Sequence, residues 1–260
     1  MKNVISEIQE GLCSLGIRKG DTLLMHSSYK SLGEFEGGAK TFFDAIISYL
    51  GEDGTLLLPA FSYDSVNFEN PVFKERETPS CTGYLSEYFR TKVPGVKRSV
   101  HATHSVCALG KHAEELTKNH KLDKTPVGKN SPITKLRDYS GKILFLGCSP
   151  DRNTSIHGVE ELCEPPYLLD RENKITYRLV DNQASVTMRE SYRHDFHKDG
   201  YDYVQKYSRI CDLLTDGEIK RGFILKAECV AMDANAVWSK GLEALMRDPY
   251  FFVDKVKAER

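Results

Sequence analysis

Little in the sequence points to a charged partner or a membrane. The formal net charge is −1, because 36 basic residues almost balance 37 acidic ones. Such a chain has no long-range field to steer it toward nucleic acid or an anionic membrane. The longest apolar stretches, such as residues 143–146 and 55–58, have the length of a strand, whereas a membrane-spanning helix takes about 20 residues. We therefore expect neither nucleic acid nor a membrane as a partner.

The cysteines lack the pattern of a structural cross-link or zinc site. There are seven, an odd number, and no two form a CxxC pair. Such scattered cysteines are typical of reduced thiols that are mostly buried and pack as small hydrophobic side chains. Residues 1–17 lack the character of a signal peptide, because Glu7 and Glu10 alternate with apolar residues as in an amphipathic helix. The sequence therefore predicts a cytoplasmic protein.

What the chain does have is an alternation of helical patterns and short apolar runs. Helical spacing covers residues 2–16, 40–50, 83–91, 113–120 and a segment from Thr154 or Ser155, as N-cap, to Cys163; strand-like runs cover 21–26, 55–59, 105–110 and 142–146. This order predicts a mixed three-layer α/β sandwich with a central, largely parallel sheet, which binds ligands at the carboxyl ends of its strands.

The last third of the chain has a different pattern. Residues 174–189 alternate as strands do, residues 202–214 form an amphipathic stretch, and residues 230–245 are typical of a closing helix with Asp233 or Asn235 near its start. This portion therefore has α+β character. Because no segment has the composition of a linker, we expect residues 1–260 to form one domain.

A run of small hydroxyl residues marks the first candidate site. It comprises His26, Ser27, Ser28, Tyr29, Lys30, Ser31 and Gly33. At a turn between a strand and a helix, such residues expose backbone N–H groups, and the helix N-terminus behind them favours phosphate. The run matches neither the nucleotide-hydrolysing P-loop nor the dinucleotide fingerprint, so a plain loop with hydroxyl caps is the alternative.

Two histidines with HxxH spacing, His101 and His104, form the second candidate. The spacing allows a metal site with Glu160 as a distant third ligand, or activation of the Cys107 thiol by His104. No supporting ligands accompany the pair, and Cys107 stands in an alternating apolar run that favours burial. We therefore predict imidazoles that hydrogen-bond the backbone at a strand entrance, and no metal.

The third candidate is residues 153–161, which follow the apolar run at 142–146. His157 is spaced i, i+3 from Glu160 and i, i+4 from Glu161, so either carboxylate can lie on its face of a helix. A carboxylate that orients an imidazole is what a general base needs. We expect Gly158 to leave one flank of the histidine open to a ligand; a purely structural histidine is the alternative.

Taken in order, these segments resemble one known family, the aminoglycoside 3-N-acetyltransferases. The resemblance covers about residues 12–165. The segments that carry it are 15–21, 26–28, Gly33, 36–39, 54–61, 98–101, 105–110, 125–132, 135–136 and 153–157 with Glu160. The chain departs from the family at Ala102, where we expect proline, and at Ala60, where threonine is common. Neither departure changes a residue to which the resemblance assigns a catalytic role.

The resemblance implies a mixed α/β fold distinct from the GNAT acetyltransferases, with acetyl-CoA as co-substrate. The acceptor would be the 3-amino group of a 2-deoxystreptamine antibiotic, deprotonated by His157, which Glu160 orients, and attacking the thioester without an acyl-enzyme. Amides in the Ser27–Ser31 turn are expected to stabilise the oxyanion. Residues expected to border the CoA arm are His26, Ser27, Ser28, Tyr29, Lys30, Ser31, Gly33, Ser105, Val106, Cys107 and Ser131.

A polycationic acceptor also needs carboxylates in its pocket. The candidates are Asp64, Glu160, Glu161 and Asp195. Residues 193–197 add a second histidine cluster, which we interpret as a solvated face, with the acceptor side of the site as the alternative.

Three other functions stay open. The first is acetylation of a different small amine, the second is a hydrolase built on Cys107 or on the His101 and His104 pair, and the third is a non-catalytic CoA-binding protein. We expect a monomer or a homodimer.

Overall fold

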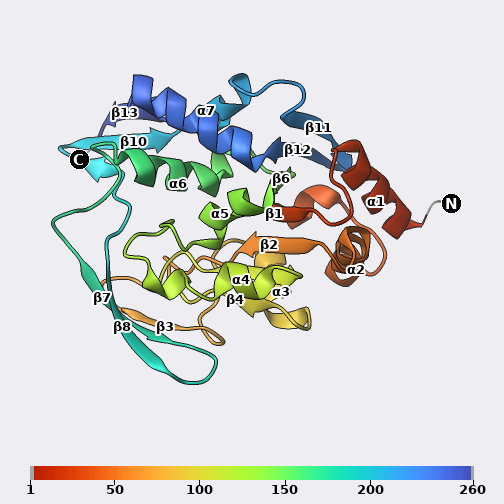
Figure 1. Cartoon of the computed structure of the whole chain (residues 1–260), viewed down its shortest axis with the longest axis horizontal. Coiled ribbons are helices and arrows are strands. Elements are labelled where there is room, and N and C mark those ends of the chain that lie inside the picture. Colours follow the sequence, from red (N-terminus) through yellow and green to blue (C-terminus); the bar gives the residue numbers. More distant parts are fainter. Residues whose placement is uncertain (1–2, 259–260) are drawn as a thin grey trace.

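A mixed seven-stranded sheet forms the centre of the molecule (Figure 1). The computed structural model describes residues 3–258. The strand order is β11-β12-β6-β1-β2-β5-β4. The strands are β1 (Thr22–Ser27), β2 (Thr55–Pro59), β4 (Lys97–Arg98), β5 (Val106–Gly110), β6 (Lys142–Leu146), β11 (Ile219–Ile224) and β12 (Ala227–Asp233). The mixed α/β class predicted from the sequence is confirmed.

Only the middle of this sheet is parallel, so the expectation of a largely parallel sheet was wrong. Strand β1 pairs in parallel with β2 and with β6, whereas the pairings of β12 with β6 and β11, and of β5 with β2 and β4, are antiparallel. The tight turn at Leu225, with a φ of 51°, joins β11 directly to β12. A connection that short permits only antiparallel pairing.

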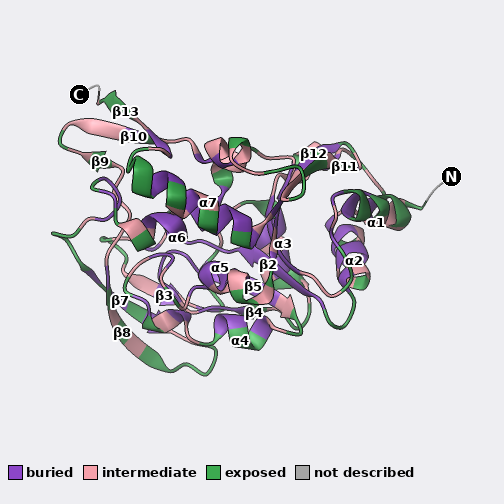
Figure 2. Ribbon diagram, turned by 45° about the horizontal axis from the view of Figure 1, so that its top comes forward, coloured by how far each residue is buried: buried purple, intermediate pink, exposed green. Residues whose placement is uncertain are grey.

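Helices cover both faces of the sheet and give the three layers expected. One face packs on α1 (Val4–Ser14), α2 (Gly38–Leu50) and α3 (Tyr84–Lys92). The other packs on α4 (Ala113–Thr117), α5 (Pro132–Lys135), α6 (Thr154–Cys163) and α7 (Ala234–Arg247). Each face of the sheet packs on its helices through a hydrophobic core. Alternate residues of β1 point into these two cores: Leu23 and Met25 into the core against α1, α2 and α3, and Leu24 into the core on the other face. Figure 2 shows buried strands between helices whose outer faces are exposed.

Helix starts differ slightly from the prediction. The N-cap of α6 is Asn153 rather than Thr154 or Ser155, because the Asn153 side chain accepts a hydrogen bond from the amide of Ser155. Asp233 caps α7, as one of the two predicted residues. Residues 230–232 belong to β12, so the closing helix begins later than its apolar pattern indicated.

Two three-stranded sheets flank the central one, with orders β3-β7-β8 and β13-β10-β9. Their strands are β3 (Val72–Lys74), β7 (Ile175–Val180), β8 (Val186–Ser191), β9 (His197–Lys198), β10 (Tyr201–Gln205) and β13 (Val253–Lys257). The alternating pattern at 174–189 is thereby confirmed as the β7–β8 hairpin, at the lower left in Figure 1. The amphipathic stretch at 202–214 splits between β10 and a 3-10 helix.

The remaining regular elements are short 3-10 helices. They are η1 (Tyr29–Leu32), η2 (His120–Leu122), η3 (Leu136–Tyr139), η4 (Pro150–Arg152) and η5 (Tyr207–Asp212). Within residues 3–258, no helix is long and apolar enough to cross a bilayer.

All seven cysteines are free thiols. Cys107 and Cys229 are buried, Cys13 is exposed and the other four are half-buried. Most of the thiols were expected to be buried, and only Cys107 and Cys229 are.

Candidate active site

The main cavity lies at the carboxyl ends of two neighbouring strands, β1 and β6, whose following helices lie on opposite faces of the central sheet. After β1 the chain returns through α2 on one face of the sheet, and after β6 it continues into α6 on the other face. The carboxyl ends of β1 and β6 lie side by side, with His26 opposite Phe145 and Ser27 opposite Leu146. Such a switch point leaves a crevice between diverging loops, and a cavity of about 970 Å³ opens there.

Two loops lie close together behind this end of the cavity. Gly147, directly after β6, has a φ of 60°, and a Cβ there would lie 1.7 Å from Oγ of Ser31. Only glycine permits that approach of the β6 loop to the β1 turn. Other parts of the cavity wall come from the segments 25–28, 59–63, 81–86, 103–104, 126, 148–157, 170, 193–197 and 205–207.

A histidine, two tyrosines and a buried glutamate form a connected group at the wall. His157 Nδ1 lies 3.3 Å from Oε2 of Glu160 and 2.9 Å from the hydroxyl of Tyr207. Tyr207 donates to Oε2 of Glu160 over 2.8 Å, and Tyr167 donates to Oε1 over 2.7 Å. Glu160 is fully buried. Since the Tyr207 proton goes to Glu160, its oxygen accepts from Nδ1–H of His157, which leaves Nε2 as the basic nitrogen.

The predicted pairing of His157 with Glu160 is therefore present, and its surroundings are richer than the spacing indicated. Tyr167 lies in the loop after α6 and Tyr207 begins η5 after β10, and no periodic pattern links them to the histidine. The flank at Gly158 is closed instead of open, because a Cβ there would lie 2.2 Å from the ring of Trp238 on α7. The glycine serves the close packing of α6 on α7.

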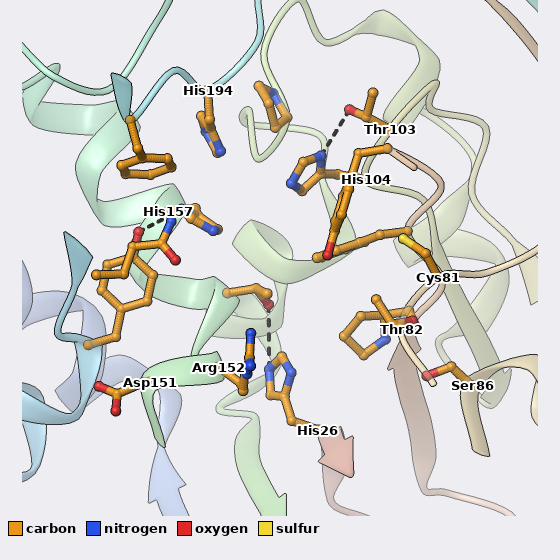
Figure 3. Close-up of a pocket in the computed structure, with 18 of the residues that line it drawn as sticks. His26, Cys81, Thr82, Ser86, Thr103, His104, Asp151, Arg152, His157 and His194 are labelled. Atoms are coloured by element: carbon orange, nitrogen blue, oxygen red, sulfur yellow. Dashed lines mark hydrogen bonds between the residues drawn. The ribbon is translucent and has the colours of Figure 1, made fainter. Parts of the chain in front are cut away.

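A second histidine–carboxylate pair lies beside the first. His194 donates from Nε2 to Oε1 of Glu161 over 2.8 Å, and both side chains are buried. The ring centroids of His157 and His194 are 4.5 Å apart. Figure 3 shows both rings on one side of the cavity, with His104 near them and His26 below. All five residues of the 193–197 cluster line the cavity, which favours the acceptor-side alternative, although the side chain of His197 is 78% exposed.

Most of the histidines near the cavity are buried and neutral. Burial, with the nearby His157, lowers the pKa of His26 to about 3, and burial lowers that of His101 to about 4. Burial and neighbouring imidazoles hold the pKa values of His104 and His194 well below the usual range. The same holds for His120, which stacks on His101 with ring centroids 4.6 Å apart.

The HxxH pair divides into two roles. His101 accepts hydrogen bonds at Nδ1 from the backbone amides of Thr103 and His104, which agrees with the backbone role predicted for it. His104 contacts Oγ1 of Thr103 and lines the cavity. Over residues 3–258, no group of three or more His, Cys, Asp or Glu side chains is arranged to hold a metal ion.

The predicted CoA turn lies only partly on the cavity. Its first three residues, His26, Ser27 and Ser28, line the cavity, and the later ones, Tyr29, Lys30, Ser31 and Gly33, do not. Two amides expected to stabilise an oxyanion are already engaged, because Ser28 donates to Leu146 and Ser31 to Ser28. We therefore assign no oxyanion donor to these two amides.

The other predicted CoA contacts lie inside the protein, away from the cavity wall. Ser105, Val106, Cys107 and Ser131 are fully buried. Ser105 donates to the carbonyl of Ala60, and Ser131 caps α5. Burial raises the pKa of the Cys107 thiol to about 12, which argues against a thiolate nucleophile there.

The predicted substrate carboxylates are scattered. Asp195 lines the cavity, whereas Asp64 is exposed and lies off its wall. Glu160 and Glu161 are buried behind the histidines. Sequence reasoning missed two further aspartates and an arginine of the wall, which carry no periodic signal: Asp151, Asp170 and Arg152.

Buried imidazoles make the stability of the fold sensitive to acid. Since the pKa values of His26 and His101 lie below the unfolded value of 6.5, the stability present above pH 6.5 is lost as the pH falls toward 4. Glu161 opposes this trend, because burial raises its pKa to about 7 and its contribution is lost as the pH rises from 4.5.

We expect the free energy of unfolding to fall by at least about 1 kcal/mol per pH unit between pH 6.5 and 5, since five buried imidazoles outweigh the carboxyl of Glu161. Urea unfolding at a series of pH values measures this slope. A stability that is flat or rises toward pH 5 would contradict neutral buried histidines.

The comparisons with known proteins agree with this geometry. The family model described as aminoglycoside 3-N-acetyltransferase matches residues 24–246. Aminoglycoside N(3)-acetyltransferase III of Acinetobacter baumannii is 26% identical over 264 residues, covering 92% of this chain and 90% of that protein. The SPbeta prophage-derived aminoglycoside N(3')-acetyltransferase-like protein YokD of Bacillus subtilis (strain 168) is 33% identical over 173 residues, covering 59% of this chain and 63% of that protein.

Solved structures show the same architecture. A variant of aminoglycoside acetyltransferase AAC(3)-IVa in complex with gentamicin superposes with a TM-score of 0.79 and 25% identity, covering 95% of this chain and 90% of that one. The binary complex of AAC-IIIb with CoASH superposes with a TM-score of 0.79 and 26% identity, covering 94% of this chain and 96% of that one. With a family match that spans both halves of the cavity wall, from β1 to α7, the resemblance is confirmed: this chain belongs to the aminoglycoside 3-N-acetyltransferase family.

Proposed function

We propose that the protein transfers the acetyl group of acetyl-CoA to an amine, with His157 as the general base. The observation that carries the proposal is the group around His157. Its Nδ1–H is held by Tyr207 and Glu160, and its Nε2 is left as a base at the cavity wall. A buried carboxylate behind the ring stabilises the imidazolium that forms when the base takes a proton.

The reaction follows from the protonation state of the acceptor. An alkylamine has a pKa of about 10 and arrives as an ammonium, which cannot attack a thioester. Once the amine is neutral it attacks the carbonyl carbon, and His157 Nε2 takes the proton from the new C–N nitrogen. The tetrahedral adduct then expels the CoA thiolate, to which His157 returns the proton.

The residues at the β1 and β6 end of the cavity fit the anionic arm of acetyl-CoA. Arg152 lines the cavity, and no described residue forms an ion pair with it. The N-terminus of α6 points into the same region through Thr154, whose hydroxyl lies 3.4 Å from Nε2 of His26. An arginine and a helix N-terminus both favour phosphate. His26, Ser27 and Ser28 remain our proposed neighbours of the arm.

For the acceptor we propose the 3-amino group of a 2-deoxystreptamine antibiotic. Family relatives solved with gentamicin and sisomicin support this choice. Asp151, Asp170 and Asp195 on the wall are the carboxylates available to its ammonium groups. One observation favours a second candidate, a smaller amine: Arg193 also lines the cavity and opposes a polycation.

The test is a thiol-release assay with acetyl-CoA across a panel of aminoglycosides and simple amines. Saturable release that depends on a 2-deoxystreptamine acceptor supports the first candidate, and release with other amines alone supports the second. Activity that survives chelation and thiol alkylation removes a metal- or cysteine-dependent hydrolase. A thermal shift with CoA but no turnover on any amine would contradict the proposal and favour a CoA-binding protein.

Tyr207→Phe tests the positioning of the base. The variant removes the acceptor for Nδ1–H of His157 and one donor to Glu160, while it keeps the aromatic packing. A hydrogen bond to a charged group contributes about 1.5–3 kcal/mol, so we expect kcat to fall about tenfold or more. The KM values for both substrates should stay near wild type, and a change in KM alone would contradict a positioning role.

The cytoplasmic location, the monomeric or homodimeric state and the single domain over residues 1–260 stay predictions. Gel filtration with light scattering measures the second, and limited proteolysis of the purified chain addresses the third.

A further inference from the structure

When an ammonium is acetylated its nitrogen loses two protons, and His157 accounts for only one of them. In the overall reaction RNH₃⁺ and the thioester give the amide, the free thiol and one proton. The proton that His157 takes from the adduct returns to the thiolate sulfur. The other proton must leave the ammonium before the C–N bond forms, because the protonated nitrogen has no lone pair.

We infer that His194 is a second catalytic base, which takes the first proton from the acceptor ammonium. This inference rests on the proposed function and names a further residue of the same site. The N–H bond of the ammonium breaks, its electron pair stays on nitrogen, and the proton passes to Nδ1 of His194. The imidazolium then loses the proton to solvent, and the neutral amine attacks as described above.

The orientation of His194 supports this role. Its Nε2–H is donated to Glu161, so the lone pair of the neutral ring lies on Nδ1. No described residue hydrogen-bonds to Nδ1, which is not an enclosed atom, and His194 lines the cavity. Glu161 in turn accepts a hydrogen bond from the amide of Val127, which fixes the carboxylate. His194 thus repeats the arrangement of His157, with the nitrogens interchanged.

The spacing of the two rings suits one bound nitrogen. The ring centroids of His157 and His194 are 4.5 Å apart, and their planes are tilted by 36°. Both rings line the same cavity. An ammonium bound beside them therefore lies close to both bases.

The surroundings of His194 keep the ring neutral and favour the release of a proton that it has taken up. The titratable groups that face it are Glu161 and His157 on α6, His104 before β5, and, at longer range, His101. Burial lowers the pKa of His194 and raises that of Glu161 to about 7. His194 is therefore neutral in the resting site, as a proton acceptor must be.

The test uses His194→Gln, with the acceptor that gives turnover in the panel. At pH 7 the ammonium form dominates, and we expect kcat/KM to fall about 10²-fold. At about pH 9.5 a large part of the acceptor is already neutral, so the variant should come within a few-fold of wild type. A residue that serves only the fold would lose activity equally at both pH values.

Two further variants complete the experiment. Glu161→Gln keeps an oxygen acceptor for Nε2 and should show the same pH-dependent loss to a smaller extent, which protects the test against misfolding of one variant. His112→Gln is the matched control, because His112 stacks on Tyr139 and does not line the cavity; it should match wild type at both pH values.

The outcomes separate this inference from the proposed function. If wild type releases no thiol with any amine, the proposed function fails. If wild type is active and His194→Gln keeps full activity at pH 7, or loses the same factor at pH 7 and at pH 9.5, the second base is overturned. His157→Ala should lose activity by a similar factor at both pH values, since its proton transfer follows bond formation.

Discussion

His157→Ala should lower kcat/KM for acetyl transfer by about 10²- to 10⁴-fold, the usual contribution of a general base. The side chain is 11% exposed and contacts Tyr207 and Phe196 at the cavity wall. Its removal enlarges an existing space more than it opens a new one, so the fold should persist. A coupled assay of thiol release measures the loss, and circular dichroism measures the fold.

A control and a rescue sharpen this result. His112→Ala removes an imidazole that stacks on Tyr139 away from the cavity, and we expect it to keep wild-type turnover. Imidazole added to the His157→Ala variant should restore part of its activity, because the vacated space can hold a small base. Near-wild-type turnover of His157→Ala would remove the histidine from the mechanism.

Arg98→Leu should cost about 3 kcal/mol or more in the free energy of unfolding, the largest stability effect that we expect. Arg98 is 6% exposed and donates to the backbone carbonyls of Ala60, Glu75 and Thr78. Its guanidinium also lies 4.7 Å from the centroid of the Phe73 ring. Leucine fills part of the volume but leaves the buried carbonyls of Glu75 and Thr78 without this donor, and each such loss costs about 1–3 kcal/mol; the Ala60 carbonyl keeps its bond from Ser105.

For a chain of this size, such a loss lowers Tm by roughly 2–4 °C per kcal/mol, which differential scanning fluorimetry resolves. Arg247→Leu is the matched control, because the Arg247 side chain is 82% exposed and its nearest carboxylate, on Glu243, is 3.9 Å away. We expect its Tm to stay at the wild-type value. Equal Tm values for the two variants would mean that solvent replaces the Arg98 donors.

Local pattern predicted the elements that carry the site. The apolar run at Lys142–Leu146 is bounded by a turn and a loop, and it forms β6 at the residues predicted. The i, i+3 spacing of His157 and Glu160 needed only a helix to bring the two side chains together. Both inferences depend on neighbours in sequence, where 3.6-residue and two-residue periods act.

What the sequence could not supply depends on distant contacts. Tyr207 and His194 reach the cavity from β-rich segments after α6, and no spacing relates them to His157. Ser105 and Ser131 resemble ligand contacts in sequence, yet their hydroxyls satisfy buried backbone groups. A hydroxyl that caps a helix and one that binds a ligand have the same local pattern, and only tertiary structure separates them.

The side-by-side placement of β1 and β6 has a consequence for how the protein comes into being. His26 and Thr154, which meet at the end of these strands, are 128 residues apart in the chain. Contacts of such long range form slowly, since closing a long loop costs entropy before any contact repays it. During synthesis the crevice cannot exist until β6 and α6 have left the ribosome. A nascent chain that ends before β6 and α6 lacks His157 and the part of the cavity wall that follows it in sequence.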